Sequence, residues 1–201
     1  LEFRRVLFRS INSWHTTGVT KIEQVYDKEL IVGASGTGSG GYVYPAAMNA
    51  LLGTKFKIVG GYPGGNEINL AMEKGEVGGR GSNSWASWKS GHPHWIREKK
   101  INILVQVALR RAPDLPDVPL MLELAKNEED KQLLTFLSAD MGIARAFATT
   151  PDAPPERVAA LRKAFQDMLR DPEFVAETTK AQMEIAPSTG EEAQRVAALM
   201  L

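Results

Sequence analysis

The stretch Leu30–Gly53, LIVGASGTGSGGYVYPAAMNALLG, determines the expected fold. It opens with a short apolar run, LIVGA, which is typical of a buried strand. A loop of glycine and hydroxyl residues comes next over residues 35–41, and residues 42–52 have the pattern of a helix that ends at Gly53. A strand, a glycine loop and a helix in this order predict an α/β unit whose loop presents backbone N–H groups at the start of the helix.

The alternation of strand and helix continues along the chain. Residues 56–59 and 101–109 are apolar runs that predict buried strands, and residues 76–79 are a brief further candidate. Asn66 can cap a helix over residues 67–74. Short strands that alternate with helices predict a mainly parallel sheet covered by helices.

The C-terminal part has a different pattern. Three prolines in APDLPDVP, residues 112–119, predict a loop. One or two helices are expected over residues 120–137, and residues 142–149 are a strand candidate. Three further helices are expected, with starts near residues 152–155, at Asp171, and at Ser188, where Glu191 completes a capping box.

The composition narrows the function class. The chain has 201 residues, with 24 basic and 24 acidic side chains and no Cys. The balanced charge argues against a nucleic-acid-binding face or a polybasic membrane patch. No apolar run approaches the roughly 18–20 residues of a membrane-spanning helix. Disulfide scaffolds, thiolate metal sites and Cys nucleophiles are excluded.

Residues 1–10, LEFRRVLFRS, are expected to be foreign to the protein. The string matches the translation of a common sequencing adapter at every position, and no turn or cap connects it to the segment that begins at Ile11. The alternative is a natural basic N-terminus. Foreign segments are set aside in fold reasoning. We therefore expect a gene cut at its 5′ end, so that the missing signal peptide says nothing about location.

The glycine loop is the first candidate site. Gly36, Gly38 and Gly41 fit the G-x-G-x-x-G spacing of a dinucleotide site, but residues 57–61, KIVGG, lack the acid that would bind a ribose. Backbone N–H groups, loop hydroxyls and a helix N-terminus together favour a small anion such as a carboxylate. A plain strand-to-helix turn is the structural alternative.

Other candidates carry weaker signals. Ser35 does not fit the G-x-S-x-G nucleophile elbow. His92 and His94 could form an H-x-H metal pair, but no third ligand lies nearby in sequence and surface histidines are the simpler interpretation. A Trp cluster predicts helix packing, with ligand stacking as the alternative; its members are Trp85, Trp88 and Trp95.

Five segments in order resemble the tripartite tricarboxylate transporter receptors, the extracytoplasmic solute-binding proteins also called Bug proteins. The most telling are LPDVP after a strand and the stretch PGGNEINLAMEKGEV. The segments are GASGTGSGGY (33–42), LLGTKFKIVGGYPGGNEINLAMEKGEV (51–77), GRGSNSWASWK (79–89), INILVQVALRRAPDLPDVP (101–119) and GIARAFATTPDAPPERVAALRKAFQDMLRDPEF (142–174).

The resemblance implies an α/β fold of the periplasmic-binding-protein type II class. Two lobes would close as a hinge on a ligand between them, and the second lobe would hold the mainly parallel sheet. Residues 11–138 would form the second lobe. Residues 139–201 would form the crossing strand and C-terminal helices of a first lobe that is incomplete here.

The resemblance also implies ligand contacts. The glycine loop would grip an anion, and a glycine pair with its helix cap would lie near the cleft. Arg80 is either a carboxylate clamp or a surface arginine. Gly78 departs from the family, which usually has an acidic or amide residue there. The implied ligand-binding residues are Ser35, Gly36, Thr37, Gly38, Ser39, Gly64, Gly65, Asn66, Arg80, Asn83 and Ser84.

The expected function is capture of a small organic carboxylate for a tripartite tricarboxylate-type transporter. We expect a periplasmic monomer that meets membrane permease subunits, and no catalytic residue, cofactor, metal or nucleic acid. One alternative is a sensor of the same fold that presents its ligand to a signalling kinase. Another is a nucleotide-dependent enzyme that uses the glycine loop, residues 36–41.

Overall fold

The computed structural model describes residues 8–139, 147–181 and 189–198. Five strands form one sheet in the order β3-β2-β4-β1-β5. β2 runs parallel to β3 and β4, whereas β1 is antiparallel to both of its neighbours. The mainly parallel α/β sheet expected from the sequence is thus confirmed. The strands are β1 Arg9–Trp14, β2 Leu30–Gly33, β3 Phe56–Val59, β4 Gly79–Ser84 and β5 Ile101–Val107.

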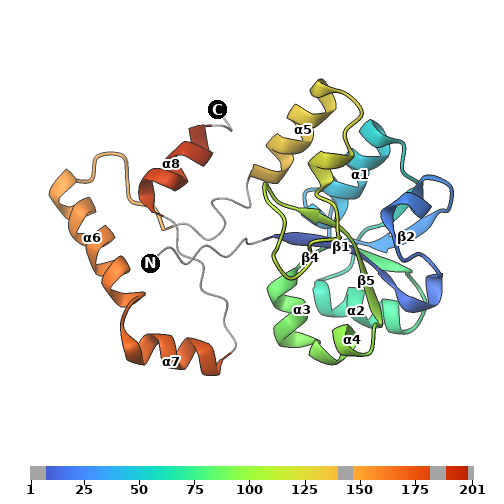
Figure 1. Cartoon of the computed structure of the whole chain (residues 1–201), viewed down its shortest axis with the longest axis horizontal. Helices are drawn as coiled ribbons and strands as arrows, with labels where there is room; N and C mark the ends of the chain where they lie inside the picture. Colours follow the sequence, from blue (N-terminus) through green and yellow to red (C-terminus); the bar gives the residue numbers. More distant parts are fainter. Residues whose placement is uncertain (1–7, 140–146, 182–188, 199–201) are drawn as a thin grey trace.

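Helices cover both faces of this sheet (Figure 1). One core contains Val32 of β2 and packs against α1 and α5; the other contains Ile68 of α2 and the tryptophans of α3 and α4. The helices of the sheet domain are α1 Gly40–Leu52, α2 Gly65–Glu73, α3 Trp85–Gly91, α4 Pro93–Arg97 and α5 Glu128–Ala139, with 3₁₀ helices η1 His15–Thr17, η2 Ile22–Tyr26 and η3 Met121–Leu124.

Strand β1 was not expected from the sequence. It lies between β4 and β5 and joins them with antiparallel hydrogen bonds on both edges. Ile11, Asn12 and Ser13 are fully buried there. Arg9 and Ser10 of this strand belong to the segment that we expect to be foreign, and the origin of that segment stays a prediction.

Two boundaries differ from those expected. The strand predicted at residues 76–79 is instead β4, which starts at Gly79, because residues 71–75 close α2 and its C-terminal turn. The N-cap of α2 is Gly64 rather than Asn66, which lies exposed in the first turn. The expected stop of α1 is confirmed, since Gly53 takes the left-handed conformation with φ 79°.

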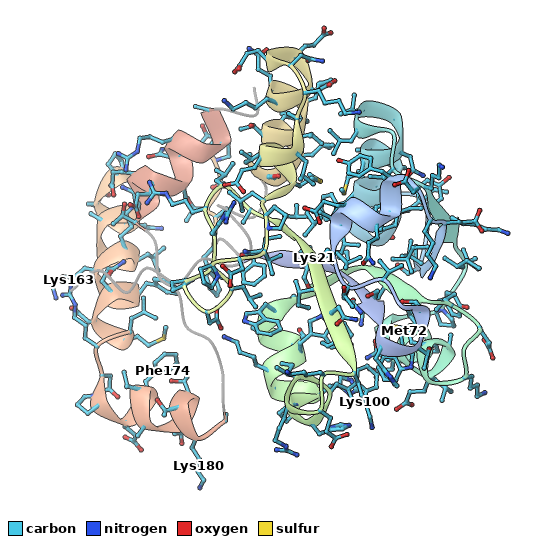
Figure 2. All side chains as sticks on the ribbon, turned by 45° about the vertical axis from the view of Figure 1, so that its right-hand side comes forward. Lys21, Met72, Lys100, Lys163, Phe174 and Lys180 are labelled. Carbon is cyan, nitrogen blue, oxygen red and sulfur yellow. The ribbon has the colours of Figure 1, made fainter. Side chains whose placement is uncertain are left out.

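Three C-terminal helices lie apart from the sheet domain in Figure 1. They are α6 Pro155–Met168, α7 Pro172–Lys180 and α8 Gly190–Ala198. Figure 2 shows Lys163 of α6 and Lys180 of α7 pointing away from the rest of the chain. Arg162 of α6 forms an ion pair of 2.7 Å with Glu191 of α8.

The expected caps of these helices are partly confirmed. Asp171 caps α7 by accepting a hydrogen bond of 2.9 Å from the backbone N–H of Phe174. Ser188 lies outside the described residues, and the reciprocal bonds of a capping box instead join Thr189 and Glu192 at 3.1 Å. Most of the strand expected at residues 142–149 also lies outside the described part, and residues 147–149 are irregular.

In the part of the chain that the structure describes, none of the helices is both long enough and apolar enough to span a bilayer.

Candidate functional site

The candidate site lies beside the carboxyl ends of β2 and β4. The chain leaves β2 toward α1 on one face of the sheet, whereas it leaves β4 toward α3 on the other face. A crevice opens where neighbouring parallel strands send their connections to opposite faces, and ligands of open α/β sheets bind in such crevices. The topology therefore places a binding site at the carboxyl ends of β2 and β4, beside the start of α1.

A pocket of about 350 Å³ occupies this place. Its volume is in the range of small-molecule sites, about 300–1,000 Å³. Its walls are mostly polar and carry no acidic residue among those described. They consist of Arg9, Gly33, Ala34, Ser35, Ser39, Gly40, Gly41, Tyr44, Gly65, Ile68, Arg80 and Ser82.

The start of α1 forms one wall. Ser39 is its N-cap residue, and the Ser39 hydroxyl donates a hydrogen bond of 2.7 Å to the carbonyl of Gly36. The first backbone N–H groups of a helix have no acceptor within it, so those of Gly40 and Gly41 remain available to a ligand. Gly81 of β4 allows the start of α1 to pack closely against β4, because a Cβ atom on Gly81 would overlap the carbonyl of Gly41.

Arg80 of β4 forms the opposite wall. Its Nη1 donates hydrogen bonds to the carbonyl of Gly65 at 3.3 Å and to Oδ1 of Asn69 at 3.1 Å. Its Cζ lies 5.7 Å from the ring centroid of Trp88, in the range of a cation–π contact. The Nε atom is buried and has no hydrogen-bond partner in residues 8–139, 147–181 and 189–198. Arg80 is therefore held by neutral groups and forms no ion pair among the described residues.

The electrostatics of the pocket follow from this unpaired charge and from Arg9, a second cation in the pocket wall. Burial, and next the nearby charge of Arg9, lower the pKa of Arg80 to about 10. The guanidinium thus stays protonated at neutral pH and keeps a positive charge in a partly desolvated place. A buried charge without a counter-ion is costly, and an anionic ligand would remove that cost.

The structure brings together only part of the predicted ligand-binding set. Arg80 is half-buried in the pocket wall rather than fully exposed, and its role as a carboxylate clamp stays a prediction. The members that line the pocket are Ser35, Ser39, Gly65 and Arg80. The members outside the lining are Gly36, Thr37, Gly38, Gly64, Asn66, Asn83 and Ser84.

The residues outside the lining have structural surroundings of their own. Thr37 and Gly38 are exposed at the tip of the loop. Asn83 is buried inside β4, where its carbonyl accepts a hydrogen bond of 3.2 Å from Ser10. Ser84 is the N-cap residue of α3.

The sequence did not predict two further lining residues, Ser82 and Tyr44, or Asn69 behind the pocket wall. Ser82 lies two residues beyond Arg80 on the same strand, so alternation along a strand at 79–84 would have paired them on one face. Tyr44 lies in the second turn of α1. From the sequence alone, an aromatic residue at this position is equally consistent with core packing. Asn69 is buried behind Arg80, and its sequence context gave no signal.

The histidines and tryptophans form a cluster behind the pocket. The His92 ring lies 4.2 Å from that of Trp95 and 5.8 Å from that of Trp88, measured between centroids. Within the described residues, no group of three or more potential metal ligands comes together. The Trp cluster packs in the core as expected, while Trp88 also contacts Arg80.

Comparison with known proteins begins with two negative results. No protein-family model matches the sequence. No curated protein matches it either.

Solved structures do match. A TctC solute-binding protein from Polaromonas superposes with a TM-score of 0.63 at 16% sequence identity, covering 98% of this chain and 68% of that one. The chain has the fold of the TctC and Bug solute-binding proteins. MatC from Rhodopseudomonas palustris, solved with bound malate, gives a TM-score of 0.57 at 19% identity, covering 98% of this chain and 66% of that one.

The periplasmic binding protein BugD gives a TM-score of 0.57 at 15% identity, again over 98% of this chain and 65% of the other. The chain thus spans about two thirds of the length of these solute-binding proteins. The periplasmic-binding-protein fold expected from the resemblance is confirmed.

Proposed function

We propose that this chain is the ligand-binding part of a periplasmic receptor that captures a small organic carboxylate for a tripartite tricarboxylate-type transporter. One observation carries most of the proposal: the Arg80 guanidinium lines the pocket with no acidic partner among the described residues. MatC, which shares the fold, was solved with malate, and this supports a carboxylate as the ligand.

The donors around the pocket suit a carboxylate. One carboxylate oxygen can accept a hydrogen bond from Arg80, and charge-assisted bonds of this kind are short and strong. The hydroxyl of Ser35 and the first amides of α1 can donate to the other oxygen. No His, Asp or Glu is among the described residues of the pocket wall, which supports binding rather than general acid–base catalysis.

Thermal unfolding of the 201-residue chain with three compounds tests this proposal. Malate should raise the Tm in a concentration-dependent manner, because a ligand that binds only the folded state stabilises it. The diamide of malate, which has the same shape without charge, should have little effect. A shift with NAD alone, or an equal shift with malate and its diamide, would contradict a carboxylate receptor.

Delivery to a permease is the second half of the proposal and rests on the shared fold. Adjacent permease genes in the source genome would support a transporter receptor. An adjacent sensor kinase gene, with no permease pair, would support the signalling alternative instead.

A further inference from the structure

Three polar side chains form a hydrogen-bonded relay that runs from the pocket wall into the molecule. Arg80 Nη1 lies 3.1 Å from Oδ1 of Asn69, and Nδ2 of Asn69 lies 3.0 Å from Nε2 of His92. Asn69 is only 5% exposed, so water cannot readily replace either bond. The three residues come from β4, α2 and the turn between α3 and α4.

The chemistry of the three groups fixes which atoms of the relay donate hydrogen bonds and which accept them. Arginine can only donate hydrogen bonds, so the amide oxygen of Asn69 must face it. The NH₂ group of Asn69 must then face His92, which requires an unprotonated Nε2 that accepts. His92 is therefore neutral, with its proton on Nδ1, whenever this arrangement exists.

We propose that His92 is a positioning residue for Arg80: its neutral form, relayed by Asn69, holds the guanidinium toward the pocket, and its protonation withdraws that support. This inference rests on the proposed function, because it assigns a pH-dependent control to the same anion site.

Protonation breaks the relay at its middle member. A cationic His92 carries a hydrogen on Nε2 and needs an acceptor, so the Asn69 amide has to turn its oxygen toward the ring. Its NH₂ group then faces Arg80, and two donors oppose each other. Within the part of the chain that the structure describes, Arg80 keeps only the carbonyl of Gly65 as a hydrogen-bond acceptor, so the guanidinium loses its fixed direction.

The surroundings of His92 shift its pKa in both directions. Burial is the largest effect that lowers the pKa of His92, and the charges of His94 and Arg80 lower it further, whereas Glu73 of α2 raises it. The neutral form is thus favoured at neutral pH and the relay opens under acidic conditions. The added imidazolium charge would attract an anion, but His92 is only half-buried, so solvent and salt weaken that attraction.

The decisive experiment is NMR of the whole chain without ligand. Nitrogen-detected spectra should show His92 as the Nδ1–H tautomer at neutral pH, and the Arg80 Nε–H signal should change with the same midpoint as His92 when the pH falls. His92→Gln keeps a carbonyl acceptor for Asn69, so Arg80 should lose this pH response. A His92 found as the Nε2–H tautomer, or an Arg80 signal that ignores its titration, would overturn the proposal.

Malate affinity at 0.15 M salt provides the second readout. Between pH 7.5 and 5.0, affinity should fall at least about threefold more in the wild-type chain than in His92→Gln, since protonation of malate itself affects both equally. An equal fall in both chains, or a wild-type affinity that rises, would also overturn it. If malate does not bind at all, the carboxylate function fails while the ligand-free NMR result still decides the relay.

Discussion

Gly65 and Arg80 fit together only because Gly65 has no side chain. A Cβ atom on Gly65 would overlap the guanidinium and lie 2.7 Å from its Cζ atom. The first residue of α2 thus sets the position of the pocket cation, and this leads to a direct test.

Gly65→Ala should displace the Arg80 guanidinium and weaken malate binding. Loss of a charge-assisted hydrogen bond costs about 1.5–3 kcal/mol, or about tenfold to a hundredfold in affinity. Gly60→Ala is the matched control, because a Cβ atom there meets nothing within 4 Å. Calorimetric titration that shows equal affinity for both variants would contradict the role given to Gly65.

Asn69→Asp should place a carboxylate against Arg80 in nearly the same shape. The new acid would pair with the guanidinium and occupy the charge that the ligand needs, so malate affinity should fall. The same carboxylate can accept a hydrogen bond from a protonated His92 and should raise the pKa of that residue. Calorimetry and a histidine NMR titration measure the two effects, and an unchanged malate affinity would count against the unpaired cation as the main binding group.

Folding stability should depend on the protonation of His92. Because the fold lowers the pKa of His92 below its usual value, the unfolded chain takes up this proton first as the pH falls. The stabilisation from the neutral ring is therefore complete above the unfolded pKa of about 6.5 and is lost as the pH falls through the lower folded pKa. Urea unfolding at pH 7.5 and 5.0 should show a larger loss for the wild-type chain than for His92→Gln.

Gln106 should be among the most sensitive polar positions for stability. It is fully buried, and its Nε2 donates hydrogen bonds to the carbonyls of Leu115 at 2.9 Å and Val118 at 2.8 Å. Its Oε1 accepts a bond of 2.8 Å from the N–H of Ala112, so this side chain holds the proline-rich loop. Gln106→Met would leave these backbone groups unpaired and should cost about 2–4 kcal/mol in urea unfolding. The exposed Gln132→Met is the control, and a similar cost there would contradict this explanation.

The apolar runs made most of the fold predictable. LIVG at β2 and INILVQV at β5 are buried strands, as their hydrophobic runs indicated. β4 was misplaced because GRGSNS has no apolar residue. Its burial arises from neighbours distant in sequence, with β1 and β2 on its edges and α1 lying against Gly81.

The site was predictable to the extent that it depends on local chain chemistry. The loop at residues 35–41 lies at a helix start as expected, and Ser35 and Ser39 line the pocket. The relay behind Arg80 was not predictable, since Asn69 and His92 lie 23 residues apart and meet only through the packing of α2 against the turn before α4. Whether Arg80 lies on the surface or in a pocket depends on where β4 begins, and the sequence did not predict the start of β4.

The most direct test of the central claim is calorimetric titration of malate into the wild-type chain and Arg80→Gln at pH 7.5. Gln keeps polar atoms near Gly65 and Asn69 but removes the cation. We predict that malate binds the wild-type chain, though weakly, because the chain spans only about two thirds of the length of the solute-binding proteins that share its fold. Affinity should fall by a further factor of at least about ten in Arg80→Gln, while the folded state is retained. Equal malate affinity in the two chains would contradict the assignment of Arg80 as the carboxylate-binding group.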